Sequence, residues 1–184
     1  MKRVISFGAV ALLFLAAADA TAQGKLSGFG AVGATTPTGD LKDIDGAKNG
    51  FAFMGGLEYK LSSALWLRFD GMMGFNGVES NFNEDAYLWT FAARGEYWLP
   101  MGSDKLRPYV TGGVGMMLYK RNPGETGLED TPQYMTKSGM LISAGAGLDY
   151  QISGTSLFVE GRYDVGADNR AFIPLMVGAR FGAR

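Results

Sequence analysis

The chain of 184 residues carries a formal net charge of −1 at pH 7 and contains 28 glycines, no cysteine and no histidine. Its length suits one domain with a substantial core, and its near-neutral charge argues against a nucleic-acid partner. The lack of cysteine excludes disulfides and a cysteine-linked lipid anchor. The lack of histidine excludes Ser-His-Asp and Cys-His nucleophilic systems and removes the commonest transition-metal ligand.

Residues 1–22 have the features of a secretory signal peptide. Two basic residues precede an almost wholly apolar run, residues 4–18, and the small residues Ala-Thr-Ala end at Ala22. The run is shorter than the roughly 20 residues that span a bilayer, so a permanent membrane helix is the weaker alternative. We therefore predict cleavage between Ala22 and Gln23, which leaves residues 23–184 as the mature domain.

The sequence GFGAVG, residues 28–33, matches the G-x-G-x-x-G spacing of a dinucleotide-binding loop. That loop requires a strand before it and a helix after it. Here a signal peptide precedes the motif, and ATTPTGD, which breaks a helix, follows it. We therefore predict a bent, glycine-rich strand and no cofactor.

Apolar and polar side chains alternate with a period of two along the mature chain, as they do in β-strands. In residues 156–165, Leu157 and Val159 point to one side, and Glu160 and Arg162 point to the other. The segments that behave in this way, together with the glycine-rich first one, are residues 25–35, 51–61, 65–76, 86–98, 108–120, 140–151, 156–165 and 173–181. Eight segments of about ten residues are typical of a transmembrane β-barrel.

The connections between these segments alternate in length. Long connections at residues 37–49, 77–86 and 121–139 alternate with short ones at residues 62–64, 100–105 and 153–156. Long outer loops and short periplasmic turns are expected of an even-stranded barrel with both termini in the periplasm. Aromatic residues gather at the predicted periplasmic ends (Tyr59, Tyr97, Tyr150, Phe181) and outer ends (Phe51, Phe75, Tyr87, Trp89). They predict two interfacial girdles.

Charged residues of both signs lie on the predicted inward faces. They are Glu58, Lys60, Arg68, Asp70, Arg94, Glu96, Asp149, Glu160, Arg162, Asp164 and Arg180. Paired and hydrogen-bonded, they could fill a narrow lumen as a structural salt-bridge network. The alternative is an ion path that is gated by rearranging the arginine–glutamate partners.

The charged residues do not point to an enzyme. Glu160 and Asp164 share a strand face and could form a carboxylate pair, but Arg162 lies between them and would hold both ionised. In the first long connection, Asp40 and Asp45 are possible cation ligands together with Asp43, but the closing glutamate of a calcium loop is missing. We expect a solvated acidic loop and no metal there. Residues 121–139, the longest connection, are the best candidate for contact with a surface ligand.

The mature chain as a whole resembles the small outer-membrane β-barrel domain family, of the eight-stranded porin-like or OmpA/OmpX type. The resemblance rests on the signal peptide and on PYVTGGVGM (108–116), SAGAGLDY (143–150), LFVEGRY (157–163) and IPLMVGARF (173–181). It implies an all-β, antiparallel, up-and-down transmembrane barrel in the bacterial outer membrane. The implied partners are outer-membrane lipid, lipopolysaccharide and the outer-membrane assembly machinery. That machinery commonly recognises a final aromatic residue, whereas Phe181 here lies three residues before the end.

These patterns lead to one main functional hypothesis. It is a non-enzymatic integral outer-membrane protein that contributes to envelope integrity or presents its surface loops to lipopolysaccharide, another protein or a host surface. One alternative is a narrow or gated porin-like channel for ions or small solutes. Another is a soluble periplasmic calyx, which would need the opposite facing, with apolar side chains inside and charges outside.

Overall fold

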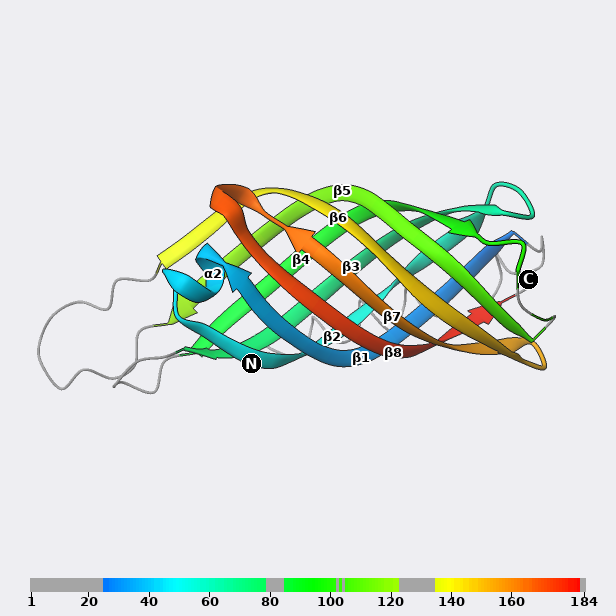
Figure 1. Cartoon of the computed structure of the whole chain (residues 1–184), viewed down its shortest axis with the longest axis horizontal. Coiled ribbons are helices and arrows are strands. Elements are labelled where there is room, and N and C mark those ends of the chain that lie inside the picture. Colours follow the sequence, from blue (N-terminus) through cyan, green and yellow to red (C-terminus); the bar gives the residue numbers. More distant parts are fainter. Residues whose placement is uncertain (1–24, 79–84, 102, 104, 123–134, 183–184) are drawn as a thin grey trace, which may run out of the picture.

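The computed structural model describes residues 25–78, 85–101, 103, 105–122 and 135–182. The described residues form eight antiparallel strands, each paired with the next, and the last pairs with the first to close a barrel (Figure 1). The strands are β1 (Leu26–Gly39), β2 (Ala47–Lys60), β3 (Leu65–Val78), β4 (Asp85–Trp98), β5 (Leu106–Asn122), β6 (Met135–Ile152), β7 (Thr155–Val165) and β8 (Arg170–Gly182). A short helix, α2 (Asp40–Asp43), follows β1, and a 3-10 turn, η2 (Ala167–Asn169), precedes β8. The predicted signal peptide lies outside the described residues.

The two ends of the barrel are distinguished by their connections. At one end, which we call the outer end, lie α2 and η2, and there β3 and β5 end and β4 and β6 begin (Figure 1). At the other end, the inner end, β1 begins, β8 ends and the strands are joined by short turns. Longer connections lie outside the cell in barrels of the outer-membrane type, so we expect the inner end to face the periplasm. Among the described residues, no helix has the length and apolar character that a membrane-spanning helix requires.

The strands are longer than the predicted ten residues. They range from 11 residues in β7 to 18 in β6, and the added residues lie mainly at the outer end. The predicted long connection at residues 37–49 is therefore wrong in extent, because β1 runs to Gly39 and β2 begins at Ala47. Strand pairing continues beyond the predicted segments, where outward residues such as Thr136 are polar. Apolar and polar side chains no longer alternate there, although the strands remain paired by their backbones.

The predicted facing is confirmed by the burial of the side chains. On β3, β4 and β8, Phe69, Phe91 and Val177 are more than half exposed on the outer wall. On the same three strands, Arg68, Arg94 and Arg180 point inward and are almost wholly buried. An apolar outer wall and a polar interior are the reverse of a soluble calyx, so the calyx alternative is wrong. The motif GFGAVG lies within β1, between β2 and β8, as the strand interpretation predicted.

Glycines that face the lumen make room for large side chains on the neighbouring strand. Gly147 is paired with Tyr109, and a Cβ atom at this glycine would overlap the tyrosine ring. Gly145 is paired with Arg162, and a Cβ atom there would lie 2.7 Å from the arginine Cγ. By contrast, no atom lies within 4 Å of the corresponding position at Gly30. The close approach of side chains from the neighbouring strand therefore explains Gly145 and Gly147. It does not explain every glycine of GFGAVG, since Gly30 has open space around it.

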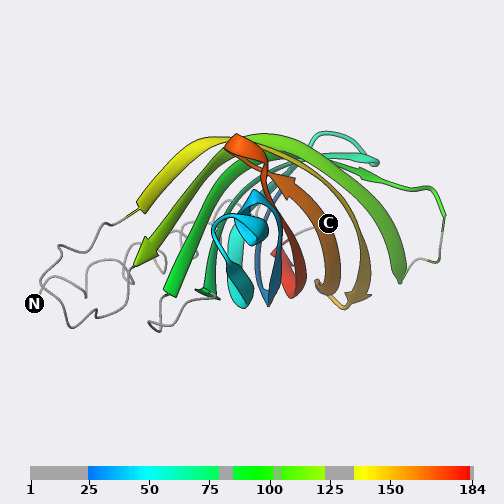
Figure 2. The same ribbon diagram turned by 60° about the vertical axis from the view of Figure 1, so that its left-hand side comes forward.

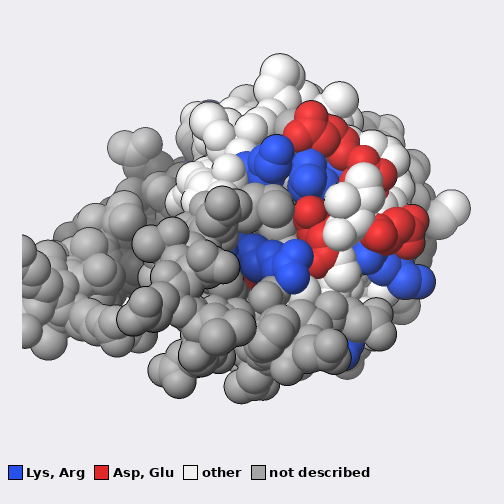
Figure 3. All heavy atoms as spheres, turned by 90° about the vertical axis from the view of Figure 1, so that its left-hand side faces the viewer, with Lys and Arg blue, Asp and Glu red and all other residues white. Residues whose placement is uncertain are grey.

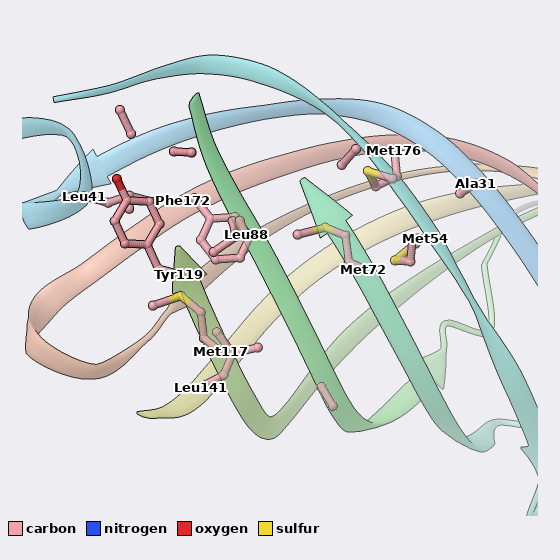
Figure 4. Packing of buried hydrophobic residues seen from close by; sticks show 14 of the residues in the cluster. Ala31, Leu41, Met54, Met72, Leu88, Met117, Tyr119, Leu141, Phe172 and Met176 are labelled. Carbon is pink, nitrogen blue, oxygen red and sulfur yellow. The ribbon is translucent and has the colours of Figure 1, made fainter. Parts of the chain in front are cut away.

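Two apolar layers lie inside the barrel, one toward each end. The outer layer includes a leucine of α2 and side chains from β4, β5, β6 and β8 (Figure 4), namely Leu41, Leu88, Met117, Tyr119, Leu141 and Phe172. The inner layer is formed by Trp66, Trp98 and Tyr109. Figure 2 shows α2 within the arch of the strands at the outer end. The charged part of the lumen lies between these two layers.

Candidate functional site

The sequence-predicted lumen residues come together in one buried network. The structure places all of them inside the barrel with exposed fractions of 5% or less: Glu58, Arg68, Asp70, Arg94, Glu96, Asp149, Glu160, Arg162, Asp164 and Arg180. They arise from β2, β3, β4, β6, β7 and β8 because each lies in phase with the inward face of its strand. Lys60, which we also placed on an inward face, is half-buried and lies over the Trp66 ring at the inner end.

Arg68 is the centre of this network. Its Nη1 donates to Glu96 Oε1 at 2.8 Å and to Glu160 Oε2 at 2.6 Å, and its Nη2 donates to Glu160 Oε1 at 3.2 Å. Glu160 lies on β7, across the barrel from β3, so this bidentate contact joins strands that are not neighbours. A bidentate arginine–carboxylate pair fixes the geometry of both side chains.

Arg180 connects the inner part of the network. Its guanidinium donates to Glu58 at 2.8 Å, to Asp149 at 2.7 Å and to Glu96 at 3.2 Å. Aromatic rings surround the same group, and the guanidinium carbon lies 4.6 Å from the centroid of Tyr109. Arg180 therefore ties β8 to β2, β4 and β6 in a layer lined by aromatic rings.

The outer part of the network is built on two further arginines. Arg162 contacts Glu160 at 2.7 Å and Asp164 at 3.4 Å, and Arg94 is paired with Asp70. Buried ion pairs stabilise a structure only when the remaining donors and acceptors also find partners. Hydroxyl groups fill part of this need, because Tyr109 donates to Glu160 at 2.8 Å.

Sequence reasoning missed several partners of these charges. Met54 Sδ accepts from Arg162 Nη1 at 2.9 Å and from Arg68 Nη2 at 3.2 Å. Met54 and Tyr109 were not assigned to the lumen, although Met54 is four residues from Glu58 and shares its phase. Alternation along each strand already places both residues on the inward face. They were missed because one is apolar and the other aromatic, and only charged residues were assigned to the lumen.

Arg170 and Asp45 form a second buried contact, at the outer end. Arg170 Nε donates to Asp45 Oδ2 at 2.6 Å, and Arg170 Nη1 donates to Asp168 at 3.0 Å. Asp45 is 2% exposed, so the prediction of a solvated acidic loop is wrong for this residue. Within the described ranges, no group of three or more His, Cys, Asp or Glu side chains is arranged to hold a metal ion. The ion pair keeps the α2 connection, with Leu41, in the mouth of the barrel.

A groove of about 560 Å³ lies on the outer ends of β2, β3 and β4. We call it the rim groove, and it is lined by Asn49, Gly50, Phe51, Phe75, Asn76, Gly77, Asp85, Ala86 and Tyr87. Phe51 stacks on Phe75 with centroids 4.9 Å apart, and Tyr87 meets Phe75 edge-on at 5.7 Å. Around the outer mouth, basic and acidic side chains are interspersed (Figure 3). We predicted that the connection at residues 121–139 contacts a surface ligand. Residues 123–134 of this connection lie outside the described residues.

An apolar outer wall, a closed strand ladder and an ionic interior define a transmembrane β-barrel of the outer-membrane type. Residues 7–181 match the sequence model of the outer membrane protein beta-barrel domain family. The chain therefore belongs to this family, and it is a protein of the bacterial outer membrane. No curated protein sequence matches the chain.

Solved structures share the fold. Neisserial surface protein A is 16% identical with a TM-score of 0.65, over 86% of this chain and 96% of that one. Ail, the attachment invasion locus protein of Yersinia pestis, is 17% identical with a TM-score of 0.58, over 85% and 99%. The N-terminal barrel domain of Pseudomonas aeruginosa OprF is 15% identical with a TM-score of 0.52, over 85% and 98%. At these identities the likeness concerns the fold alone.

Proposed function

We propose that this protein is a sealed, non-enzymatic outer-membrane barrel that supports the envelope and makes contacts through its outer surface. The observation that carries this proposal is the buried ionic network between two apolar layers. A conducting pore must bind ions weakly enough to release them. Here Arg68, Arg94 and Arg180 are each held by carboxylates from other strands, and Arg162 is held by two carboxylates of its own strand. Removing one partner of such a buried pair costs about 3–5 kcal/mol.

The same contacts argue against catalysis by the lumen carboxylates. A general acid or base needs a carboxyl group that can exchange a proton with a substrate. Glu160 accepts hydrogen bonds from Arg68, Arg162 and Tyr109, which favour its ionised form and occupy its oxygens. A rigid, ion-paired interior therefore supports a structural role.

Contacts with other molecules are assigned to the outer surface. Ail has been solved in complex with the heparin analogue sucrose octasulfate. In the present chain, the connections 77–86 and 121–139 contain Glu79, Asp85 and Glu125 among other acidic residues, so a polyanion of that kind is a poor match by charge. We infer that this rim recognises outer-leaflet lipid or a protein partner, and that residues 121–139 contribute to the contact.

A narrow channel is the second candidate, and one observation favours it. Several buried polar atoms of the described lumen have no hydrogen-bond partner within the protein, among them Asp70 Oδ1, Thr90 Oγ1, Glu96 Oε2 and Thr111 Oγ1. Enclosed water commonly satisfies such atoms. A hydrated interior is a first requirement for conduction.

Planar-bilayer recording distinguishes the two candidates. Purified monomer should give no steady single-channel current at neutral pH. Sizeable, steady currents from the unaltered protein would overturn the sealed barrel.

The surface role is tested by replacing residues 124–133 with a short glycine-rich turn. Binding of whole cells to host surfaces and to partner proteins is then compared between the altered and unaltered protein. Unchanged binding would remove this connection from the proposal.

A further inference from the structure

We propose that the rim groove binds a small, soluble organic cation with an alkylated ammonium head, which lies against the aromatic rings and faces the carboxylate of Asp85. This inference goes beyond the proposed function, because a sealed barrel that supports the envelope needs no small-molecule ligand. It rests on three features of the groove: a notch at its centre, aromatic rings beside the notch and a single carboxylate at its edge.

The notch is formed where a β-bulge opposes a glycine. At the outer end of the β2–β3 ladder, Lys48 and Asn49 together oppose the single residue Gly77. Bulges redirect side chains and are common next to active sites. A Cβ atom added at Gly77 would have no other atom within 4 Å. The backbone of β3 therefore borders open space at the centre of the groove.

A buried side chain fixes the shape of the bulge. Asn76 is 6% exposed, and its Nδ2 donates to the backbone oxygen of Lys48 at 2.8 Å and to Thr35 Oγ1 at 2.9 Å. The bulge is thereby tied to β3 and, through Thr35, to β1. A preformed shape of this kind is usual for small-molecule sites.

Aromatic rings form the wall of the groove beside the notch. Phe51, Phe75 and Tyr87 lie two residues nearer the middle of their strands than Asn49, Gly77 and Asp85 respectively. The rings of Phe75 and Tyr87 meet at 77° with centroids 5.7 Å apart, so ring surfaces face in two directions. The electron-rich face of an aromatic ring attracts a cation, and groups of such rings recognise quaternary ammonium ligands.

The charge of the groove selects a cation. Asp85 is exposed and is the cross-strand partner of Gly77, so its carboxylate borders the notch. No lysine or arginine is among the described residues that line the groove. Lys48 belongs to the bulge, and Lys120 lies beyond Tyr87 on β5, so both are outside the lining. A phosphate or sulfate would be repelled by Asp85, whereas an ammonium ion would be attracted.

The same lining favours an alkylated ammonium over a metal ion or a sugar. A hard metal ion needs several oxygen ligands, and the described lining offers one carboxylate. A sugar needs hydrogen bonds on several sides, but the amide nitrogen of Asn76 is already used within the protein. An alkylated ammonium needs one opposite charge and apolar contact. A volume of about 560 Å³ is in the range of small-molecule sites.

The test compares choline with 3,3-dimethylbutan-1-ol, which has the same shape and no charge. Binding is measured by saturation-transfer NMR on the folded protein in a maltoside detergent, because this detergent carries no ammonium group. We expect choline to bind about tenfold more tightly than the uncharged probe. Gly77→Val fills the notch and should weaken choline binding about tenfold, and Tyr87→Leu and Asp85→Asn should each weaken it about fivefold. Asp85→Asn should leave binding of the uncharged probe unchanged.

Matched controls are available on the same protein. Gly30→Val adds the same side chain at an outward glycine of β1 that also has open space around it. Tyr97→Leu removes an outward tyrosine at the inner end, and Asp43→Asn removes an exposed carboxylate of α2. All three variants should bind choline as the unaltered protein does, and heat-modifiable gel migration should show every variant folded.

Two results would overturn the proposal. One is equal binding of choline and the uncharged probe by the unaltered protein, because the groove would then be merely apolar. The other is unchanged choline binding by both Gly77→Val and Asp85→Asn, because choline would then bind elsewhere. Neither result depends on whether the lumen conducts, so the sealed barrel and the ammonium site are tested separately.

Discussion

Arg170 holds Asp45 through two hydrogen bonds of 2.6 and 3.2 Å, across a separation of 125 residues in sequence. The first residue of β8 is thereby joined to the connection that follows β1. Between the ends of that connection, Leu41 is buried in the outer apolar layer with Phe172. The connection that carries α2 is therefore held in the outer mouth by an ion pair.

The Arg170–Asp45 pair should therefore stabilise the outer layer. Arg170→Ala leaves a buried carboxylate unpaired, and we expect a loss of about 3–5 kcal/mol in the free energy of unfolding. Urea unfolding in lipid vesicles, followed by tryptophan fluorescence, measures this. Lys42→Ala, an exposed change on α2, is the control. Asp45→Ala and the double variant complete a double-mutant cycle. If the losses of unfolding free energy in the two single variants simply add up in the double variant, a direct interaction is contradicted.

Arg68 should be the most sensitive position of the lumen. Replacing it with alanine leaves Glu160 and Glu96 with one fewer cation, so folding into vesicles should be strongly impaired and stability reduced by about 3–5 kcal/mol. Arg68→Lys keeps the charge and loses the bidentate contact, so an intermediate stability is expected. Folding yield by gel migration and urea unfolding are the measurements. Near-normal stability of Arg68→Ala would show that the network does not hold the barrel together.

Gly147→Ala should destabilise the barrel, because the added methyl group overlaps Tyr109, whose hydroxyl donates to Glu160 at 2.8 Å. Overpacking of this kind costs about 1–3 kcal/mol. Gly30→Ala is a matched control on an outward face with open space around it, and its stability should be unchanged or slightly higher. If urea unfolding gives the same midpoint for both variants, the close approach of Gly147 to Tyr109 has no energetic role.

The three tryptophans of the chain report directly on the orientation of the faces. Trp89 is 38% exposed on the outer wall, whereas Trp66 and Trp98 are 1% and 2% exposed inside. Brominated lipids should strongly quench a protein that keeps only Trp89, and they should quench the Trp89→Phe variant only weakly. Steady-state fluorescence in vesicles measures both. Strong quenching of the inward pair would contradict the assignment of faces.

The signal peptide remains a prediction. Mass spectrometry of protein purified from outer membranes should give a mature chain that begins at Gln23. Ala22→Leu should block processing, because a large side chain replaces the small residue before the cleavage site. A mature chain of full length would contradict the proposed cleavage.

Much of the fold follows from local sequence pattern. Alternation with a period of two identified the segments, and it assigned Arg68, Glu160 and Arg180 to the inward face, since successive side chains of a strand point to opposite sides. It underestimated strand length, because the outward residues at the outer strand ends, such as Thr136, are polar. It also assigned Asp45 to a solvated loop, since nothing in its neighbourhood points to Arg170.

The sequence by itself determined which side chains share a face of each strand, because facing depends only on parity along the strand. The closed barrel decided that the charged face is turned inward and the apolar face outward, which excludes the calyx. The tertiary structure decided which charges meet. Arg68 reaches Glu160 only because barrel closure and strand register bring β3 and β7 to opposite sides of one narrow lumen. The two apolar layers, the Arg170–Asp45 contact and the rim groove beside Lys120 likewise depend on register. Register is a property of the whole closed sheet, and no single strand encodes it.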